Sequence, residues 1–388
     1  MKKIYLSGAS LCFLLAACGG GSSTSTAPVA VVTPVVTLDA VTSASAATAS
    51  QLGLSALTGN SSTASVYDLV ADVGDSWRLT LNQDGSFSIR VLSTQYGLSD
   101  LSGTYSKTTS GSLVTLTGAN GSFDLKLDTR TSTLVGRVKL GAIAATVTGS
   151  SYALPASLSN LAGIYNFIGK GRNASNGGSP STVAGTISLD ASGKSVTVCV
   201  GGQANANGTC SNVSTQTAAQ APVTLTVQTN NADGRLHLQQ NGSEFGTLTV
   251  QAGDRGAVLV FDHYGYNTDT PPVMRSGALY AVKQQALTGS ELNGSWDCAD
   301  AGTAIASLSV SGSVIQATLL PSTTAATNNL SFNKVNDANN LFSINGFAVN
   351  VASGDSISQG ALVLPLSSSL FAVERVAAKS VALCRLSK

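Results

Sequence analysis

Residues 77–91 read WRLTLNQDGSFSIRV, and this stretch decides the fold class. Trp77, Leu79 and Leu81 alternate with polar residues, as they do when successive side chains point to opposite faces of a strand. The alternation breaks at Asp84-Gly85 and then resumes. An Asp-Gly pair suits a hairpin turn, because Gly adopts a positive φ at no steric cost and Asp accepts hydrogen bonds from nearby backbone N–H groups. The stretch therefore predicts a β-hairpin.

The same alternation recurs along most of the chain. Further examples lie at residues 123–127, 134–140, 223–227, 236–238, 330–332 and 381–383. It gives about 20–25 short runs separated by turn residues, whereas long runs with a helical period are rare. We therefore expect an all-β protein, built from tandem small antiparallel β-barrel or β-sandwich domains.

Three short segments share a spacing of leucine, glycine two residues later, and an aromatic residue two after that. They are Leu101–Tyr105, Leu161–Tyr165 and Leu292–Trp296. Alternation places these residues on one face of a strand, where a glycine lets a neighbouring backbone come close, as at the bends of barrels. The segments are similar to the opening strand of lipocalins and of the avidin family, although inward packing residues of any antiparallel sheet would look alike. They serve as boundary markers.

The markers divide the folded part of the chain into three β blocks, residues 55–153, 158–286 and 290–388. A division into two domains, with a boundary near residue 154, fits nearly as well. The first and third blocks are each long enough for about six to eight strands, which suffices for a small sandwich or barrel.

The N-terminus has the features of an export signal. Lys2 and Lys3 precede an apolar run at residues 4–17, which is too short to span about 30 Å of hydrocarbon as a stable helix. The run ends in Leu15-Ala16-Ala17-Cys18, with small residues before the cysteine. This stretch resembles the cleavage box of bacterial lipoprotein precursors.

The resemblance implies that residues 1–17 are a signal peptide and that Cys18 becomes the new N-terminus. Its thiol would receive a diacylglyceryl group and its amine an acyl chain such as palmitate, so that lipid anchors the protein. Gly19, in place of aspartate, implies sorting to the outer membrane of a Gram-negative bacterium. The alternative is an ordinary secreted protein whose signal happens to contain Cys12 and Cys18.

The segment after the anchor is expected to be a tether. Residues 18–52 consist mostly of Gly, Ser, Thr, Ala, Val and Pro and contain a single charged residue, Asp39. Such a composition has too little bulky apolar surface to offset the entropy of ordering. We expect a lipidated, disordered linker between the membrane and the β blocks.

Four cysteines lie in the β blocks: Cys199, Cys210, Cys298 and Cys384. An even number in an exported chain predicts disulfides, and three pairings are open. We favour Cys199–Cys210, which closes a short loop, and Cys298–Cys384, which joins the two ends of the third block. The first and last strands of an up-and-down barrel are neighbours, so the second bridge favours a closed barrel there.

Composition excludes one class of partner. The formal net charge is +1 and only 11% of residues are charged, so the chain lacks the basic surface that binds phosphates. We therefore expect no nucleic-acid partner. The 40 glycines and the low charge indicate a surface covered mainly by Ser, Thr, Asn and Gln, as in exported strand-rich proteins.

One polar stretch is a candidate ligand site. Asp262, His263, Tyr264 and Tyr266 place an acid, an imidazole and two phenols at the expected end of a strand, where they could line a pocket. The alternative is a polar loop whose tyrosines pack on the edge of the core.

Catalytic and metal motifs are missing from the sequence. It has no Gly-x-Ser-x-Gly elbow and no Cys-x-x-Cys pair, and disulfides would leave no free thiol in the β blocks. We therefore predict no catalytic residues, no cofactor and no metal.

The sequence favours a non-enzymatic outer-membrane lipoprotein with a binding or envelope-structural role. Its partners would be the membrane, through the lipid on Cys18, and a protein or small-molecule ligand; the face of the membrane stays open. One alternative is an envelope hydrolase that uses carboxylates such as Asp254, Asp262 or Asp269. Another is an integral outer-membrane barrel.

Overall fold

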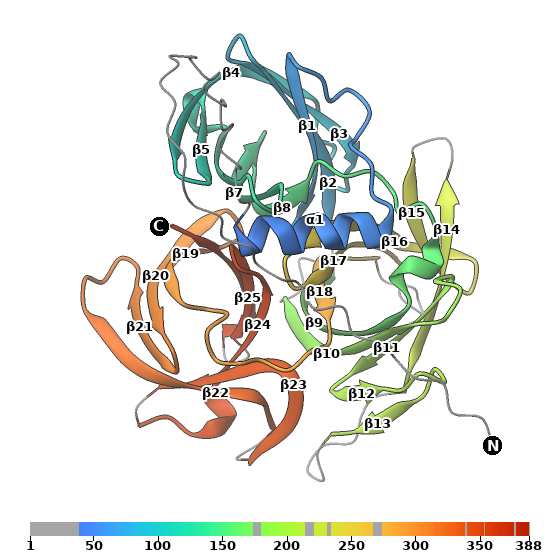
Figure 1. Cartoon of the computed structure of the whole chain (residues 1–388), viewed down its shortest axis with the longest axis vertical. Coiled ribbons are helices and arrows are strands. Elements are labelled where there is room, and N and C mark those ends of the chain that lie inside the picture. The colour runs from blue at the N-terminus through green and yellow to red at the C-terminus, as the bar shows by residue number, and fades with distance from the viewer. Residues whose placement is uncertain are drawn as a thin grey trace, which may run out of the picture. The chain divides into compact units, whose positions relative to one another are not determined.

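The computed structural model describes residues 39–173, 180–213, 221–230, 234–266, 274–337, 340–352, 354–375 and 378–387. Over these residues the chain forms three closed antiparallel barrels of eight strands each (Figure 1). This architecture confirms the expected all-β fold of tandem small domains. Residues 38–388 make up one compact unit, so the barrels pack on one another.

Barrel 1 consists of β1 (Ala64–Ala71), β2 (Asp75–Asn82), β3 (Ser86–Ser93), β4 (Leu101–Ser110), β5 (Leu113–Gly118), β6 (Phe123–Asp128), β7 (Thr133–Leu140) and β8 (Ile143–Ser150). Barrel 2 consists of β9 (Gly163–Asn173), β10 (Ser181–Leu189), β11 (Ser195–Val200), β14 (Val223–Asn230), β15 (Arg235–Gln240), β16 (Ser243–Gly253), β17 (Gly256–Tyr266) and β18 (Met274–Lys283). A separate hairpin, β12 (Gly202–Ala204) and β13 (Cys210–Asn212), interrupts it. Barrel 3 consists of β19 (Gly294–Asp300), β20 (Thr303–Ser311), β21 (Val314–Leu319), β22 (Ala325–Asp337), β23 (Asn340–Val351), β24 (Ala361–Ser367), β25 (Leu370–Arg375) and β26 (Ser380–Leu386).

Each barrel is an up-and-down meander, in which strands pair with their neighbours in sequence and the last strand pairs with the first. The barrels occupy residues 64–150, 163–283 and 294–386, each inside one of the three expected β blocks. Short 3₁₀ turns lie at Ala119–Gly121, Leu158–Leu161 and Ile357–Gln359. The division into three blocks, not two, follows the strand pairing.

The hairpin at residues 77–91 forms as its sequence predicts. Leu81 pairs with Phe87 across the turn, and Gly85 has a φ of 84°. The Asp84 carboxylate accepts a hydrogen bond from the backbone N–H of Ser86 at 2.8 Å, which fixes the turn. The turn residues and the alternation together therefore set the register of β2 and β3.

The linker prediction is wrong over its last part, because α1 is a 13-residue helix at Ala40–Leu52. The Asp39 carboxylate caps it by accepting from the N–H of Thr42 at 2.9 Å, and Gly53 ends it with a φ of 62°. Leu52 is buried in the core of barrel 2. Composition alone does not indicate the helix, since the burial of Ser45, Thr48 and Leu52 and two good caps stabilise a segment of small residues that would not fold in isolation. Among the described residues no helix is both long and apolar enough to cross a membrane.

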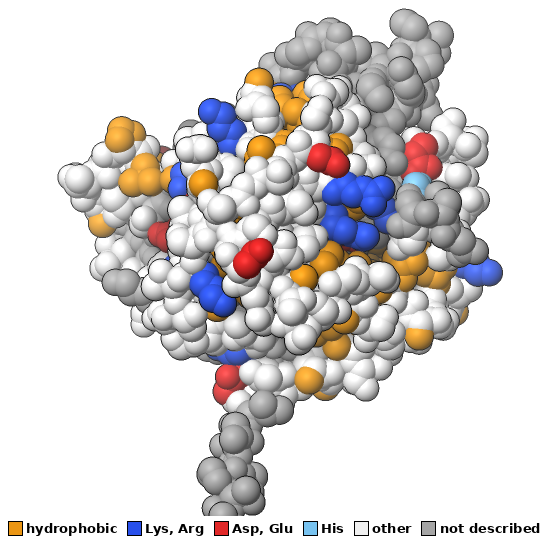
Figure 2. All heavy atoms as spheres, turned by 90° about the horizontal axis from the view of Figure 1, so that it is seen from above, with side chains coloured by type: hydrophobic (Ala, Val, Ile, Leu, Met, Phe, Trp, Pro, Cys, Tyr) orange, Lys and Arg blue, Asp and Glu red, His pale blue; other side chains and the backbone are white. Residues whose placement is uncertain are grey.

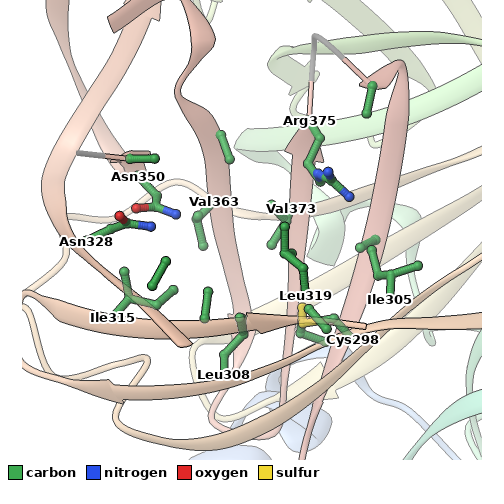
Figure 3. Close-up of a pocket in the computed structure, with 18 of the residues that line it drawn as sticks. Cys298, Ile305, Leu308, Ile315, Leu319, Asn328, Asn350, Val363, Val373 and Arg375 are labelled. Carbon is green, nitrogen blue, oxygen red and sulfur yellow. A yellow bond between two sulfur atoms is a disulfide. The ribbon is translucent and has the colours of Figure 1, made fainter. Parts of the chain in front are cut away.

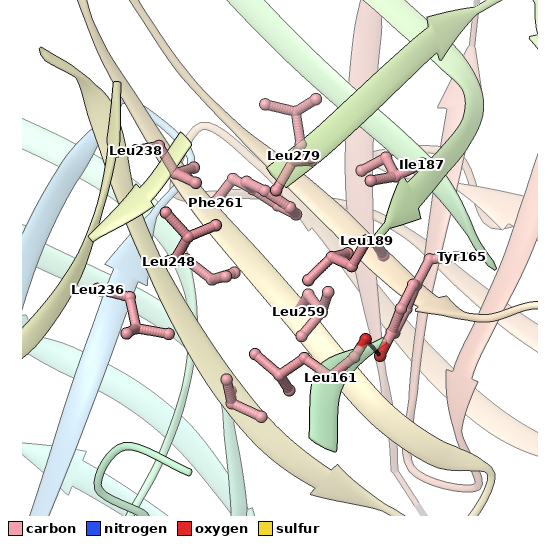
Figure 4. Packing of buried hydrophobic residues seen from close by; sticks show 14 of the residues in the cluster. Leu161, Tyr165, Ile187, Leu189, Leu236, Leu238, Leu248, Leu259, Phe261 and Leu279 are labelled. Atoms are coloured by element: carbon pink, nitrogen blue, oxygen red, sulfur yellow. Dashed lines mark hydrogen bonds between the residues drawn. The ribbon is translucent and has the colours of Figure 1, made fainter. Parts of the chain in front are cut away.

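The barrels are closed around apolar side chains. Figure 4 shows the interior of barrel 2, which holds Leu236 of β15, Leu248 of β16, and Leu259 and Phe261 of β17. Barrel 1 has an equivalent core that includes Trp77. In these two barrels large side chains occupy the inward positions, so the interior is packed.

A further apolar cluster lies outside the barrels, where they meet. It joins Val70 of barrel 1, Val258 and Val260 of barrel 2, and Leu364 and Leu383 of barrel 3. Some strands are consequently buried on both faces, and β17 and β24 carry unbroken apolar runs instead of alternation. Each barrel therefore has its own core, and this shared apolar cluster also packs the three barrels against one another.

Both favoured disulfides form, Cys199–Cys210 and Cys298–Cys384. The second links β19 to β26, the strands that close barrel 3. The surface fits the composition. On the face shown in Figure 2, white uncharged polar groups and backbone cover most of the area, with positive and negative side chains in small groups.

Candidate ligand-binding site

Barrel 3 differs from the other two in what its strands place inside. Near one end of the barrel the inward positions hold small or polar residues, among them Ala317, Ala326, Asn328, Asn350 and Ala361. The corresponding interiors of barrels 1 and 2 hold Leu, Val, Ile and aromatic side chains. These substitutions leave a cavity of about 310 Å³ in barrel 3 (Figure 3).

The inner end of this cavity, called the barrel 3 cavity below, is apolar and closed. Phe371 and the Cys298–Cys384 disulfide line it. Behind them Trp296 packs against Phe371 with ring centroids 4.6 Å apart, and its indole N–H donates to the carbonyl oxygen of Leu292 at 2.8 Å. Trp296 and Phe371 therefore fill the barrel beyond this end of the cavity.

Three polar side chains project into the upper part of the barrel 3 cavity. Phe371, Val373 and Arg375 alternate on the inward face of β25, so the strand itself carries the guanidinium inside the barrel. In Figure 3 the amides of Asn328 and Asn350 lie on the opposite side of the cavity from Arg375, above Ile315. The arrangement combines an apolar floor with a polar upper wall.

These polar groups are not engaged by the protein. Among the described residues, Arg375 and the side chain of Asn328 have no ion pair or hydrogen bond. The side-chain oxygen of Asn350 is buried without a donor. Buried polar groups normally have partners, since leaving one unpaired costs about 1–3 kcal/mol, so the wall offers unused binding capacity.

The mouth of the barrel 3 cavity has an apolar rim. Leu319, which lines the cavity, is 52% exposed. This leucine gives the opening an apolar edge.

The predicted ligand loop is not a loop. β17 runs to Tyr266, and the residues from Asp262 to Tyr266 pair with β18. The side chains of His263, Tyr264 and Tyr266 lie outside the described part of the structure. The loop assignment is wrong because the pairing of β17 and β18 continues beyond the last apolar residue, which the sequence pattern could not reveal.

Asp262 itself is fully buried at the contact between barrels 1 and 2. Its carboxylate accepts hydrogen bonds from Ser76 and, at 3.1 Å, from Ser93, and lies 3.6 Å from the guanidinium of Arg235. Burial raises the pKa of Asp262 to about 6, although Arg235 opposes the rise. This side chain faces barrel 1 and does not line the barrel 3 cavity.

The carboxylates considered for a hydrolase are not brought together. Asp254 lies in the turn before β17 and accepts a hydrogen bond from the backbone N–H of Ser368 at 2.9 Å. Gly256 begins β17 directly after this turn, and Asp262 lies six residues further along the strand. At ~3.3 Å per strand residue, Asp262 is therefore about 20 Å from the turn that contains Asp254. Paired glycosidase carboxylates are only about 5–9.5 Å apart. Asp269 lies outside the described residues.

In the part of the chain that the structure describes, no group of three or more His, Cys, Asp or Glu side chains could hold a metal ion. The chain matches no protein-family model and no curated protein sequence. The barrel 3 cavity is therefore the feature on which a function can be based.

The residues of this cavity were missed by the sequence patterns, although a signal was present. The inward positions of β22 alternate as regularly as the leucines of barrel 1, but at the cavity they hold the small Ala326 and the polar Asn328. An arginine in phase with Phe371 and Val373 is a second sign. The inward-facing residues of the third β block are therefore smaller and more polar than those of the first two blocks.

Proposed function

We propose that this chain is an outer-membrane lipoprotein, anchored by lipid on Cys18, that binds a small apolar ligand in barrel 3 and does no chemistry on it. The observation that carries the proposal is the barrel 3 cavity. Its volume of about 310 Å³ is comparable to small-molecule sites, which start at about 300 Å³. Like them, it is mostly apolar with a few polar groups.

The anchor half of the proposal is supported by the N-terminal sequence. Lys2, Lys3, the apolar run and the Leu15–Cys18 box have the order of a lipoprotein signal. Among the described residues the first helix begins at residue 40, so the proposed tether after Cys18 would be about twenty residues long. Two disulfides suit an oxidising envelope compartment.

The two alternatives are less well supported. An integral outer-membrane barrel turns its apolar side chains outward and its polar ones inward, whereas barrels 1 and 2 hold their apolar cores inside. For a hydrolase the barrel 3 cavity offers one carboxylate, that of Asp355, beside an arginine and amides, whereas a glycosidase uses a pair of carboxylates.

Filling the barrel 3 cavity should weaken ligand binding. In Ala317→Phe the ring would occupy the space between β21 and the cavity floor, so the affinity for an apolar fluorescent probe such as N-phenyl-1-naphthylamine should fall at least about tenfold. The melting temperature should not fall, because the ring fills a void. Fluorescence titration and calorimetry on residues 38–388 measure both.

The matched control is Gln316→Phe, which adds the same ring to the outward face of the same strand. It should leave probe affinity unchanged. Equal probe binding by wild type and by Ala317→Phe would exclude the barrel 3 cavity as the binding site.

Cys18→Ala should abolish lipidation. In Gram-negative cells grown with labelled palmitate, wild-type protein should carry label and Cys18→Ala should carry none, because the acceptor thiol is missing. Cys12→Ala is the matched control and should be labelled normally. Label retained by Cys18→Ala, or lost by Cys12→Ala, would refute the assignment of the anchor.

A further inference from the structure

The charge inside barrel 3 has no counter-charge next to it. Arg375 is half-buried on the inward face of β25, and within the described residues it forms no ion pair. The one acidic residue of the lining, Asp355, is exposed at the rim and is not within 4.0 Å of the guanidinium. Water screens an exposed carboxylate far more than a half-buried guanidinium, so Arg375 sets the sign of the potential inside.

An unpaired guanidinium inside a barrel favours the binding of an anion. Partial burial of a cation costs free energy unless it is paired, and the planar fork of arginine matches a carboxylate with two parallel hydrogen bonds. The amides of Asn328 and Asn350 face the same space and can donate N–H groups to a second oxygen acceptor. The upper wall is therefore built for a small anionic head group.

The lower part of the barrel 3 cavity limits the tail that such a ligand can carry. Ile305, Leu308, Ile315 and Phe371 form an apolar pocket that ends at the Cys298–Cys384 disulfide. At ~30 Å³ for each water-sized group, a volume of about 310 Å³ holds roughly ten such groups. One short alkyl chain fits this space, whereas a lipid with two long chains does not.

We infer that barrel 3 binds a single-chain carboxylate amphiphile of medium length, with its head group on Arg375 and its chain directed at the disulfide floor. The inference rests on the proposed function, because it names the ligand class of the same cavity. The exposed Leu319, which lines the same cavity, fits this class, since it adds apolar surface for the chain.

The experiment compares three ten-carbon ligands, decanoate, 1-decanol and decylammonium, by titration calorimetry on residues 38–388, which contain all three barrels. We expect decanoate to bind most tightly and decylammonium most weakly. In Arg375→Gln the affinity for decanoate should fall about 10- to 100-fold, the range expected for losing a hydrogen-bonded charge pair. The affinity for 1-decanol should stay within about twofold.

The control variants separate head-group recognition from folding. Arg90→Gln makes the same charge change at an exposed position of β3 and should leave decanoate affinity unchanged. Arg375→Lys keeps the charge without the fork and should lose less affinity than Arg375→Gln.

The results distinguish the ligand class inferred here from the proposed binding function. Equal affinities of decanoate and 1-decanol, with no effect of Arg375→Gln, would overturn the inference and leave the proposed function standing. Tightest binding of decylammonium would also overturn it and assign the head-group site to Asp355. Failure of all three ligands and of the apolar probe would refute the proposed function itself.

Discussion

Replacing Lys170 by methionine should lower the free energy of unfolding by about 3–5 kcal/mol at pH 7, the usual cost of removing one partner from a buried ion pair. Lys170 lies in β9 of barrel 2, and its ammonium lies 2.8 Å from the Asp72 carboxylate of barrel 1. It also donates to Asp300 of barrel 3. One side chain thus joins all three barrels, and methionine keeps its apolar stem while removing the charge.

The loss should depend on pH. Burial raises the pKa of the Asp72 carboxyl, and Lys170 opposes this rise. Without the lysine the pKa of Asp72 should rise further, so the folded variant holds a proton to higher pH than the unfolded chain does. A group whose pKa is raised in the folded state favours folding below its unfolded pKa and loses that contribution as the pH rises. The difference in the free energy of unfolding between Lys170→Met and wild type should therefore shrink from pH 7 towards pH 4.

Urea unfolding at several pH values measures this difference. Lys194→Met is the matched control, because Lys194 is exposed and forms no ion pair among the described residues; it should change stability by less than about 0.5 kcal/mol. Similar stabilities for Lys170→Met and Lys194→Met would show that the charged contact does not hold the barrels together.

The contact at Lys170 shows why only part of the fold follows from the sequence. Alternation and Asp-Gly turns report on neighbouring strands, and each barrel consists of pairings between neighbours, so the all-β class and the blocks could be predicted. Lys170, Asp72 and Asp300 come from three different barrels. Nothing in their local patterns says which barrel faces which.

The packing between barrels did leave a trace in the sequence. The run at 257–261 is apolar without interruption, which indicates a strand buried on both faces. The tandem barrels form as expected, and the breaks in alternation mark the strands through which they also contact one another. Asp262 is likewise out of phase with Leu259 and Phe261 and therefore faces barrel 1.

The ligand cavity and the longer disulfide occur in the same barrel. Alanines at inward positions of barrel 3 remove packing contacts that barrels 1 and 2 keep, and lost packing lowers stability. The Cys298–Cys384 bridge crosses the β19–β26 seam of that barrel and forms part of the cavity floor. We infer that the covalent closure offsets the packing given up for the cavity.

Removing this bridge should therefore be costly. In the double variant Cys298→Ala, Cys384→Ala, the free energy of unfolding of barrel 3 should fall by about 4–5 kcal/mol. The bridge closes a loop with a sequence separation of 86 residues. Trp296 is buried in barrel 3 and Trp77 in barrel 1, so the fluorescence of Trp296 in a Trp77→Phe background follows barrel 3 during urea unfolding.

The other disulfide provides the comparison. Cys199–Cys210 has a separation of only 11 residues, for which chain entropy gives about 3 kcal/mol, and it lies in barrel 2 and its hairpin. Replacing these two cysteines by alanine in the same Trp77→Phe background should shift the Trp296 transition less than opening the Cys298–Cys384 bridge does. An equal shift from both pairs would mean that the three barrels unfold as a single cooperative unit, and barrel 3 would then have no separate need for its bridge.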